Sequence, residues 1–361
     1  MIKFMNLNDQ KVYKKLDPNK VAESIESLTL QMKQVLEQAD LKKLPADYSR
    51  VTQVVVNGMG GSNIGVGLVK AALSDRLRAP ITITPGYQVP ASVNQDTLYL
   101  ISSYSGGTEE PLSVFNEVRR RGAKILGIAE EGDNKLARLM KENNIFGYTF
   151  RPDNNPSGQP RLGLGYSVLG VALLLSRAGL VEIKNGEIEK IIANLEKSGE
   201  NLVPDRPIKM NPAKQAALKL HGKIPVIVGA EFLVGNLNVL RNQFNETSKN
   251  FAAYLELPDM NHYALESLTN PKSNKDNLAF LFVDSALYHP RVEQRAVLTK
   301  QIVKKNKISC LEYKLSGQTK LGQAFEMLQF GCWLTYYLAM LNDVNPVKIP
   351  WVDWFKKQLG E

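Results

Sequence analysis

The chain has 361 residues, of which 43% are hydrophobic and 22% are charged, a composition typical of a globular protein with material for two domains. Its two cysteines, Cys310 and Cys332, exclude a disulfide framework and favour a reducing compartment, so we expect a cytoplasmic location. The first twenty residues contain no apolar signal-peptide core, and the longest apolar runs are too short to cross a bilayer. We therefore expect no secretion and no membrane partner.

The charge is moderately basic, with 45 Lys and Arg against 36 Asp and Glu and a formal net charge of +9. The lysines are spread along the chain, and the densest group, Lys304, Lys305 and Lys307, lies beside a predicted strand as a solvated edge. We therefore expect no nucleic-acid partner, since such proteins concentrate basic residues on one face. A mild positive field is compatible with a small anionic substrate.

The first half of the chain alternates strands and helices. An amphipathic helix is predicted from 18 to 43 because apolar residues recur there at helical spacing. Strands are predicted at 51–58, 81–84, 97–104 and 123–130, and helices at 64–75 and 111–122. Such alternation predicts a parallel sheet.

The second half repeats this organisation. Strands are predicted at 223–230, 277–284 and 308–315, and helices at 236–250, 292–306, 321–341 and 351–359. Two more helices, at 165–177 and 187–199, separate the halves, and three prolines break the pattern near 201–211. We predict an α/β fold of two doubly wound parallel-sheet subdomains flanked by helices. Its parts are an N-terminal helical segment (1–45), a first subdomain (46–200) and a second subdomain with C-terminal helices (201–361).

A glycine-rich turn, GMGGSNIG at 58–65, follows the first buried strand and opens a helix. Glycines let the backbone approach an anion, and the free amides of a helix N-terminus face it. Gly60, Gly61 and Ser62 are therefore candidate phosphate ligands. A dinucleotide site would need an acidic residue after the next strand, and none is present at 81–86. The alternative is a tight strand-to-helix connection without a ligand.

A second turn, SSYSGGTEE at 102–110, offers Ser103, Ser105 and Thr108 around a Gly-Gly pair. Short hydroxyls beside helix amides form a neutral cradle for a phosphate, and Thr108 could also cap the helix. The alternative is that the hydroxyls only cap a turn. Because neighbouring ends of parallel strands face one crevice, both turns could bind one ligand. A phosphate monoester is therefore the predicted ligand of the first subdomain.

GMGGS and SYSGGTEE resemble the phosphate-binding segments of the sugar isomerase (SIS) domain. Together with their surroundings they are similar to the bifunctional phosphoglucose/phosphomannose isomerase family. The resemblance extends through the segments 159–170, 226–247, 257–262 and 351–359. It implies two SIS-type subdomains and the conversion of glucose or mannose 6-phosphate into fructose 6-phosphate, a step of glycolysis and gluconeogenesis. It also implies that neither a metal nor a cofactor takes part.

By similarity to the family motifs, Glu246 in NETS is the base that moves a proton between C2 and C1 of the sugar. Arg161 in QPR is the partner of the enediolate formed between these carbons. A carboxylate suits reversible proton transfer, and arginine has a permanent charge on a fork that can span two oxygens. Without the resemblance, the two would be an exposed glutamate at a helix end and a surface arginine.

His262 in MNH resembles the histidine that opens the sugar ring, which in this family comes across a dimer interface. His221 and His289 are the alternatives, because the chain has three histidines. Lys356 matches the family's terminal lysine near the ring oxygen, although Lys357 beside it leaves that assignment open.

Three departures from the family pattern concern the second half of the chain. Tyr263 and Ala264 follow Asn-His where the family has asparagine and glutamate. The segment NPVKIPW at 345–351 lacks a threonine that would help to accommodate both C2 epimers, which makes mannose 6-phosphate the less secure substrate. Cys332 stands where an aspartate is common, for a reason that concerns either packing or catalysis.

Two other interpretations stay open: a non-catalytic phosphosugar-binding module, and an isomerase of another phosphosugar. The phosphate turns read only the group that such ligands share. The resemblance further implies a homodimer with a shared active site. The aromatic-rich helix at 321–341 could lie in its interface, or it could be an ordinary core helix.

Overall fold

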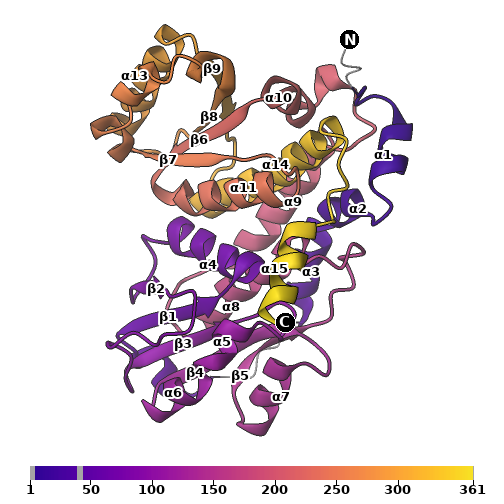
Figure 1. Ribbon diagram of the computed structural model, residues 1–361. Helices are drawn as coiled ribbons and strands as arrows, with labels where there is room; N and C mark the ends of the chain where they lie inside the picture. Colours follow the sequence, from indigo (N-terminus) through magenta and orange to yellow (C-terminus); the bar gives the residue numbers. More distant parts are fainter. Residues whose placement is uncertain (1–4, 39–43, 361) are drawn as a thin grey trace.

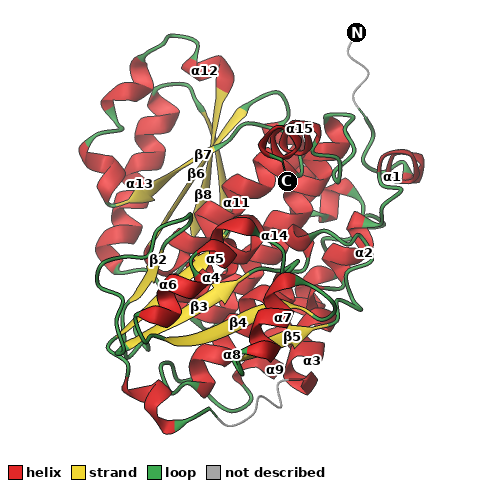
Figure 2. Ribbon diagram, turned by 60° about the horizontal axis from the view of Figure 1, so that its bottom comes forward, coloured by secondary structure: helices red, strands yellow, loops and turns green. Residues whose placement is uncertain are grey.

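The computed structural model describes residues 5–38 and 44–360 and contains two parallel β-sheets, each flanked by helices (Figure 1). Both sheets are doubly wound, because the chain enters each one at an inner strand and extends it in both directions. This confirms the predicted α/β class with two subdomains. Helices α4 (Gly60–Ala72), α11 (Val234–Glu246) and α14 (Lys320–Leu341) lie between the two sheets (Figure 2).

The first sheet has the strand order β2-β1-β3-β4-β5, with all neighbours parallel. Its strands are β1 (Gln53–Gly58), β2 (Ile81–Ile83), β3 (Thr97–Ser102), β4 (Lys124–Glu130) and β5 (Phe146–Phe150). The central strands are buried on both faces, as their continuous apolar runs require. Alternate residues face α6 (Phe115–Arg120) and α7 (Lys135–Glu142) on one side, and α4 (Gly60–Ala72) on the other. Helices α5 (Glu109–Ser113) and α8 (Gly170–Arg177) complete this subdomain.

The second sheet has the order β7-β6-β8-β9 and is also parallel throughout. Its strands are β6 (Ile224–Ala230), β7 (Ala253–Leu257), β8 (Leu278–Asp284) and β9 (Ser309–Lys314). Its helices are α10 (Pro212–Leu220), α11 (Val234–Glu246), α12 (Asn274–Asn277), α13 (Pro290–Lys305), α14 (Lys320–Leu341) and α15 (Pro350–Leu359).

The remaining helices cover the ends and sides of the two sheets. They are α1 (Gln10–Leu16), α2 (Val21–Glu26), α3 (Leu28–Gln38) and α9 (Glu187–Gly199). Short 3-10 helices join these elements at η1 (Ala46–Arg50), η2 (Pro160–Leu162), η4 (Ile208–Met210), η5 (Glu231–Leu233), η6 (Asp259–His262) and η7 (Glu266–Thr269). A buried π-helical turn, η3 (Gly165–Leu169), precedes α8.

The aromatic-rich helix α14 is buried almost along its whole length within a single chain, and it packs on α10 and α11. Of the two alternatives for this helix, core packing is therefore the one observed. Among the residues that the structure describes, no helix has the length and apolarity needed to cross a membrane.

The structure differs from the predicted elements at their ends, at sheet edges and in helices α1, α7 and α10, which were not predicted. The helix predicted at 18–43 is divided at Ser27 into α2 and α3, and its last five residues lie outside the described residues. The helix predicted at 111–122 is likewise divided at Val114. Strands β5 and β7, both at sheet edges, were not predicted.

Candidate active site

The two predicted phosphate turns lie side by side at the carboxyl edge of the first sheet. Strands β1 and β3 pair so that Gly58 lies opposite Ser102. A Cβ on Gly58 would come within 2.8 Å of the Ser102 carbonyl oxygen, so the close approach requires glycine at this position. The chain continues from β1 to the strand on one side and later to the strand on the other. This is the switch point of the sheet, where α/β proteins bind ligands.

Ser62 joins the two turns. Its buried hydroxyl accepts a 2.8 Å hydrogen bond from the Tyr104 amide, and its carbonyl accepts a 3.1 Å bond from the Ser102 hydroxyl. The two turns therefore form one rigid edge. Ser62 therefore links the two turns, and the glycine-rich motif alone did not indicate this structural role.

The serine-threonine turn is also bonded internally. The hydroxyls of Ser103 and Thr108 are 2.8 Å apart, and the Thr108 amide donates to the Ser103 oxygen at 3.3 Å. Ser105 accepts a longer bond of 3.4 Å from the Gly107 amide. Thr108 occupies the N-cap position of α5, but its side chain makes no capping bond, so the capping suggested for Thr108 is wrong. The hydroxyl of Thr108 is instead bonded to that of Ser103.

The open surface of this edge consists of small residues. Gly60 and Ser105 are exposed, Gly61 and Thr108 are half-buried, and Ser62 and Ser103 are buried. Gly60 starts the 13-residue helix α4 with a φ of +50°, a conformation that favours glycine. The unsatisfied amides and partial positive charge of that helix start suit an anion. The arrangement has the shape and polarity for a phosphate group.

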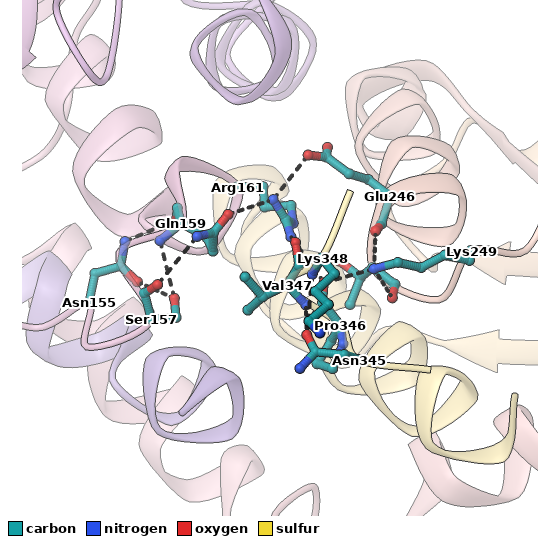
Figure 3. Close-up of polar contacts among 11 residues, drawn as sticks. Asn155, Ser157, Gln159, Arg161, Glu246, Lys249, Asn345, Pro346, Val347 and Lys348 are labelled. Carbon is teal, nitrogen blue, oxygen red and sulfur yellow. Dashed lines mark hydrogen bonds and ion pairs between the residues drawn. The ribbon is translucent and has the colours of Figure 1, made fainter. Parts of the chain in front are cut away.

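The predicted base and arginine come together between the subdomains. Glu246 is the last residue of α11 in the second subdomain, and Arg161 lies in η2 of the first. An Arg161 Nη1 donates to Glu246 Oε1 at 3.1 Å (Figure 3). The arginine side chain is 7% exposed and the glutamate side chain 35% exposed, so the carboxylate is reachable from solvent while its partner is fixed.

Arg161 is fixed by three further hydrogen bonds. Its Nη1 also donates to Gln159 Oε1 at 2.9 Å, and its Nη2 donates to the carbonyl oxygens of Pro346 and Val347 at 3.0 and 2.8 Å. Its Nε is buried without a hydrogen-bond partner among the described residues. Burial lowers the pKa of the Arg161 guanidinium, and the charge of Glu246 opposes that effect. An arginine keeps its proton under such conditions, so Nε is a charged donor without an acceptor among the described residues.

The ion pair lies beside the glycine turn. A Cβ placed on Gly61 would be 3.4 Å from the Arg161 amide nitrogen, and α4 packs on η2. The two turns and the Arg161–Glu246 pair therefore lie next to each other.

The other predicted site residues lie on exposed elements. His262 ends η6, next to β7, and is exposed; no hydrogen bond to its side chain is found among the described residues. Lys356 and Lys357 lie on the exposed helix α15. The charge of Asp353, at the start of the same helix, weakly opposes the lowering of the Arg161 pKa, so that end of α15 lies near the arginine.

The alternative histidines occupy helix ends. His289 is the N-cap of α13, where its Nδ1 accepts a bond from the Arg291 amide at 3.2 Å. His221 is the C-cap of α10, and its amide donates to the Ala217 carbonyl oxygen. A capping function explains His289 without a ligand.

Sequence reasoning missed the residues that hold the pair in place. Gln159 stands in the quoted QPR segment without an assigned part, yet it orients Arg161. Lys249 follows Glu246 by three residues and contacts the same loop as the arginine. The only indication in the sequence was that both residues lie close to the motifs. Gln159 accepts a hydrogen bond through its side-chain amide oxygen and Lys249 donates to main-chain carbonyl oxygens, and neither contact requires a recognisable pattern.

Cys332 has a packing explanation. It is buried in α14, where Gln243 Nε2 of α11 donates to its Sγ at 3.0 Å. Burial raises the pKa of the Cys332 thiol to about 12, which keeps the thiol uncharged. The residue therefore belongs to the contact between α11 and α14.

A cavity of about 920 Å³ lies near β4, β5 and α7, and none of the predicted site residues lines it.

Comparison with solved structures supports the fold. The chain superposes on a hypothetical protein from Thermus thermophilus with a TM-score of 0.73 and 14% identity, covering 98% of this chain and 93% of that one. A glucose-6-phosphate isomerase like protein from the same organism gives a TM-score of 0.63 at 15% identity, covering 98% and 99%. Residues 209–359 match the family model described as the bacterial phospho-glucose isomerase C-terminal SIS domain. The second half of the chain thus matches an SIS domain of the phospho-glucose isomerase type, and the whole chain has the fold of the solved structures above.

Curated relatives narrow this class. The chain is 29% identical over 344 residues to the bifunctional phosphoglucose/phosphomannose isomerase of Caldicellulosiruptor bescii, covering 94% of this chain and 98% of the relative. It is 29% identical over 324 residues to the enzyme of the same name from Aquifex aeolicus, covering 89% and 95%. Over most of its length the chain is thus similar to the bifunctional phosphoglucose/phosphomannose isomerase family.

Proposed function

We propose that this protein is an aldose–ketose isomerase that interconverts glucose 6-phosphate with fructose 6-phosphate through a cis-enediolate. The single observation that carries the proposal is the Arg161–Glu246 pair, 3.1 Å apart beside a phosphate-binding edge. Proton transfer needs a base and a cation at one carbon–carbon bond, at a fixed distance from the phosphate that anchors the sugar.

The phosphate would bind at the two turns, with Gly60, Gly61, Ser105 and Thr108 at the open surface and Ser62 and Ser103 beneath them. Backbone amides and hydroxyls bind the dianion without adding charge near the reacting carbons. The names of the relatives point to this substrate class, and the mildly basic chain favours it.

The reaction moves one proton from C2 to C1 and a second proton from the C2 hydroxyl to the C1 oxygen. Glu246 takes the proton from C2 of the open-chain aldose, the electron pair forms the C1–C2 double bond, and the negative charge moves to the oxygen on C1. Glu246 then returns a proton to C1, while the proton on the C2 hydroxyl moves to the C1 oxygen to leave the ketose. Arg161 stabilises the enediolate, because its charge is already in place before the reaction and needs no reorganisation.

Ring opening requires a proton to move between the ring oxygen and the C1 hydroxyl. We assign this step to His262 of the partner subunit, with Lys356 near the ring oxygen. The exposure of His262 and the position of α15 near Arg161 support this assignment.

A homodimer is part of the proposal. Helix α15 exposes Trp351, Trp354 and Phe355 by 82%, 58% and 56%. Exposed aromatic side chains gathered on one short helix mark an interaction surface. A second copy of this chain would cover them and complete the site. We also propose a cytoplasmic location, which the two cysteines without disulfide partners support.

Mannose 6-phosphate is the second proposed substrate, as the names of the relatives suggest. The loop at 345–348 contributes carbonyl oxygens to Arg161 and offers no hydroxyl side chain, so we expect a preference for glucose 6-phosphate.

A coupled assay tests the proposal. Purified protein receives fructose 6-phosphate, and glucose 6-phosphate and mannose 6-phosphate are detected separately. Glu246→Gln should abolish both products while it keeps the size of the side chain. Glu142→Gln is the matched control, because Glu142 also ends a helix and is exposed.

Proton exchange with the solvent separates the alternatives. In deuterated water an isomerase incorporates deuterium into the sugar at C1 or C2, whereas a binding module does not. Binding of fructose 6-phosphate without exchange would contradict the proposal and favour a non-catalytic module. An isomerase of another phosphosugar would show neither product from fructose 6-phosphate.

A further inference from the structure

Lys249 donates three hydrogen bonds at the Glu246 end of α11. Its Nζ contacts the carbonyl oxygens of Glu246 at 2.9 Å, Thr247 at 3.3 Å and Pro346 at 3.1 Å (Figure 3). The first two carbonyls belong to the last residue and the C-cap of the helix, which have no partner further along it. A cation at this position also opposes the negative end of the helix dipole.

The third bond reaches a different segment. Pro346 lies 97 residues further on, and its carbonyl oxygen also accepts a bond from Arg161 Nη2. The loop is shaped locally by Asn345, whose Oδ1 accepts from the amides of Val347 and Lys348 at 2.8 and 3.2 Å. The Pro346 carbonyl oxygen thus accepts hydrogen bonds from two cationic side chains, Lys249 and Arg161, and Arg161 is also the ion-pair partner of Glu246.

The backbone conformation at Lys249 is unusual for a residue with a side chain. Its φ is +53°, in the left-handed region that residues with a Cβ seldom adopt. A glycine or asparagine would be the ordinary choice there. The bonds of the side chain provide a reason for lysine at this position.

We propose that Lys249 is a positioning residue of the isomerase, which ties the 345–348 loop to the end of α11 so that Arg161 and Glu246 face each other. This inference rests on the proposed function. Lys249 itself need not contact the substrate. It fixes the Pro346 carbonyl, that carbonyl fixes one side of the Arg161 fork, and the fork fixes the carboxylate that moves the proton.

The charge of Lys249 is sensitive to its surroundings. Partial burial is the main cause that lowers the pKa of Lys249 to about 8, and the positive charge of Arg161 is the second. The negative charge of Glu246 opposes both. The other charged groups on the elements around it are Lys348 on the loop and Asp353 on α15. An uncharged amine would hold the carbonyls less strongly, because charge-assisted hydrogen bonds are the stronger ones.

The first test compares Lys249→Met with Lys249→Arg in the isomerase assay. We expect Lys249→Met to lower kcat by roughly 10- to 100-fold, the effect of a misplacement of about 1 Å at a reacting group. KM should change much less than kcat, because the phosphate turns lie in the other subdomain. Lys249→Arg keeps the charge and should recover most of the loss.

Lys307→Met is the matched control. Lys307 also follows a helix end with a left-handed φ of +60°, and it is exposed, with no hydrogen bond from its side chain to any residue that the structure describes. Its kcat and KM should equal those of the wild type. Thermal unfolding of all variants separates an effect on stability from an effect on the site.

The outcomes are distinct. A Lys249→Met protein that unfolds at a lower temperature but keeps its kcat below that temperature would overturn the proposal, since Lys249 would then only cap α11. A wild-type chain without isomerase activity would overturn both this proposal and the proposed function. If Lys249→Met does not fold, the pH profiles of wild type and Lys249→Arg decide: kcat should fall above about pH 8 in the wild type alone. Identical alkaline profiles would overturn the proposal.

Discussion

Gly235→Ala tests whether the contact between the subdomains sets the geometry of the site. Gly235 lies at the start of α11, where a Cβ would come within 2.3 Å of the Gly67 carbonyl oxygen and 2.7 Å of the Leu68 Cα. Both are main-chain atoms of α4, which cannot rotate away. Ordinary contact begins at 3.4 Å, so the helices must separate by roughly 1 Å.

Two consequences follow from this separation. Overpacking of this kind costs about 1–3 kcal/mol of unfolding free energy. Because α4 begins at the phosphate turn and α11 ends at Glu246, the same movement changes the distance between the anchored phosphate and the base. A displacement of about 1 Å can lower kcat by roughly 100-fold.

Gly67→Ala provides the matched control at the same contact. A Cβ on Gly67 would meet only the Cδ1 of Ile83, at 4.0 Å, which is ordinary van der Waals distance. Alanine in a helix interior is favoured over glycine by about 1 kcal/mol, so this variant should be as stable as the wild type or more so. Denaturant unfolding and steady-state kinetics of both variants check the reasoning. A Gly235→Ala protein with the stability and kcat of the wild type would refute it.

Three further predictions concern other parts of the chain. Lys214→Met should lower the unfolding free energy by about 2–4 kcal/mol without changing kcat, because the buried Lys214 Nζ donates to three main-chain carbonyls that would lose their partner. Burial lowers the pKa of Lys214 to about 8, below its unfolded value of about 10.4; the unfolded chain therefore binds more protons between these values, and the wild type should gain more stability than Lys214→Met from about pH 8 to 10 in denaturant titrations. Trp354→Glu, on the exposed face of α15, should halve the mass measured by light scattering and abolish activity, and a fully active monomer would contradict the shared site. Arg161→Lys should lower kcat by roughly 100-fold or more, because lysine keeps the charge but loses the fork; kcat equal to that of the wild type would contradict the assigned part.

The sequence was sufficient for the elements that are buried on both faces. Strands such as β1 and β8 are continuous apolar runs, and each was predicted within about two residues. The strands that were missed, β5 and β7, lie at sheet edges and are only partly buried, so their apolar pattern is short and irregular. Their existence depends on the neighbouring strand, which a local pattern does not contain.

The residues of the candidate site also differ in how far they could be identified from the sequence. The two turns that we propose as the phosphate site were identified from local chemistry, because glycine and hydroxyl residues at strand ends can face an anion. Arg161 and Glu246 are 85 residues apart and lie in different subdomains, so only the family resemblance suggested that they meet. Gln159 and Lys249 could not be predicted at all, because any donor or acceptor of suitable length can bind a carbonyl or amide group.

The nitrogen atoms of Arg161 differ in their contacts: Nη1 and Nη2 hold the side chain in place, whereas Nε is left to bind a ligand in the proposed mechanism. Its Nη2 is occupied by the two loop carbonyls, and Nη1 is shared between Gln159 and the Glu246 carboxylate. The buried Nε has no partner among the described residues. A buried charged donor without an acceptor is costly, and that cost is removed when an anionic oxygen arrives. An enediolate oxygen carries more negative charge than the hydroxyl or carbonyl of the bound sugar. In the proposed mechanism, Nε would therefore stabilise the intermediate more than the substrate, which is the condition for lowering the barrier.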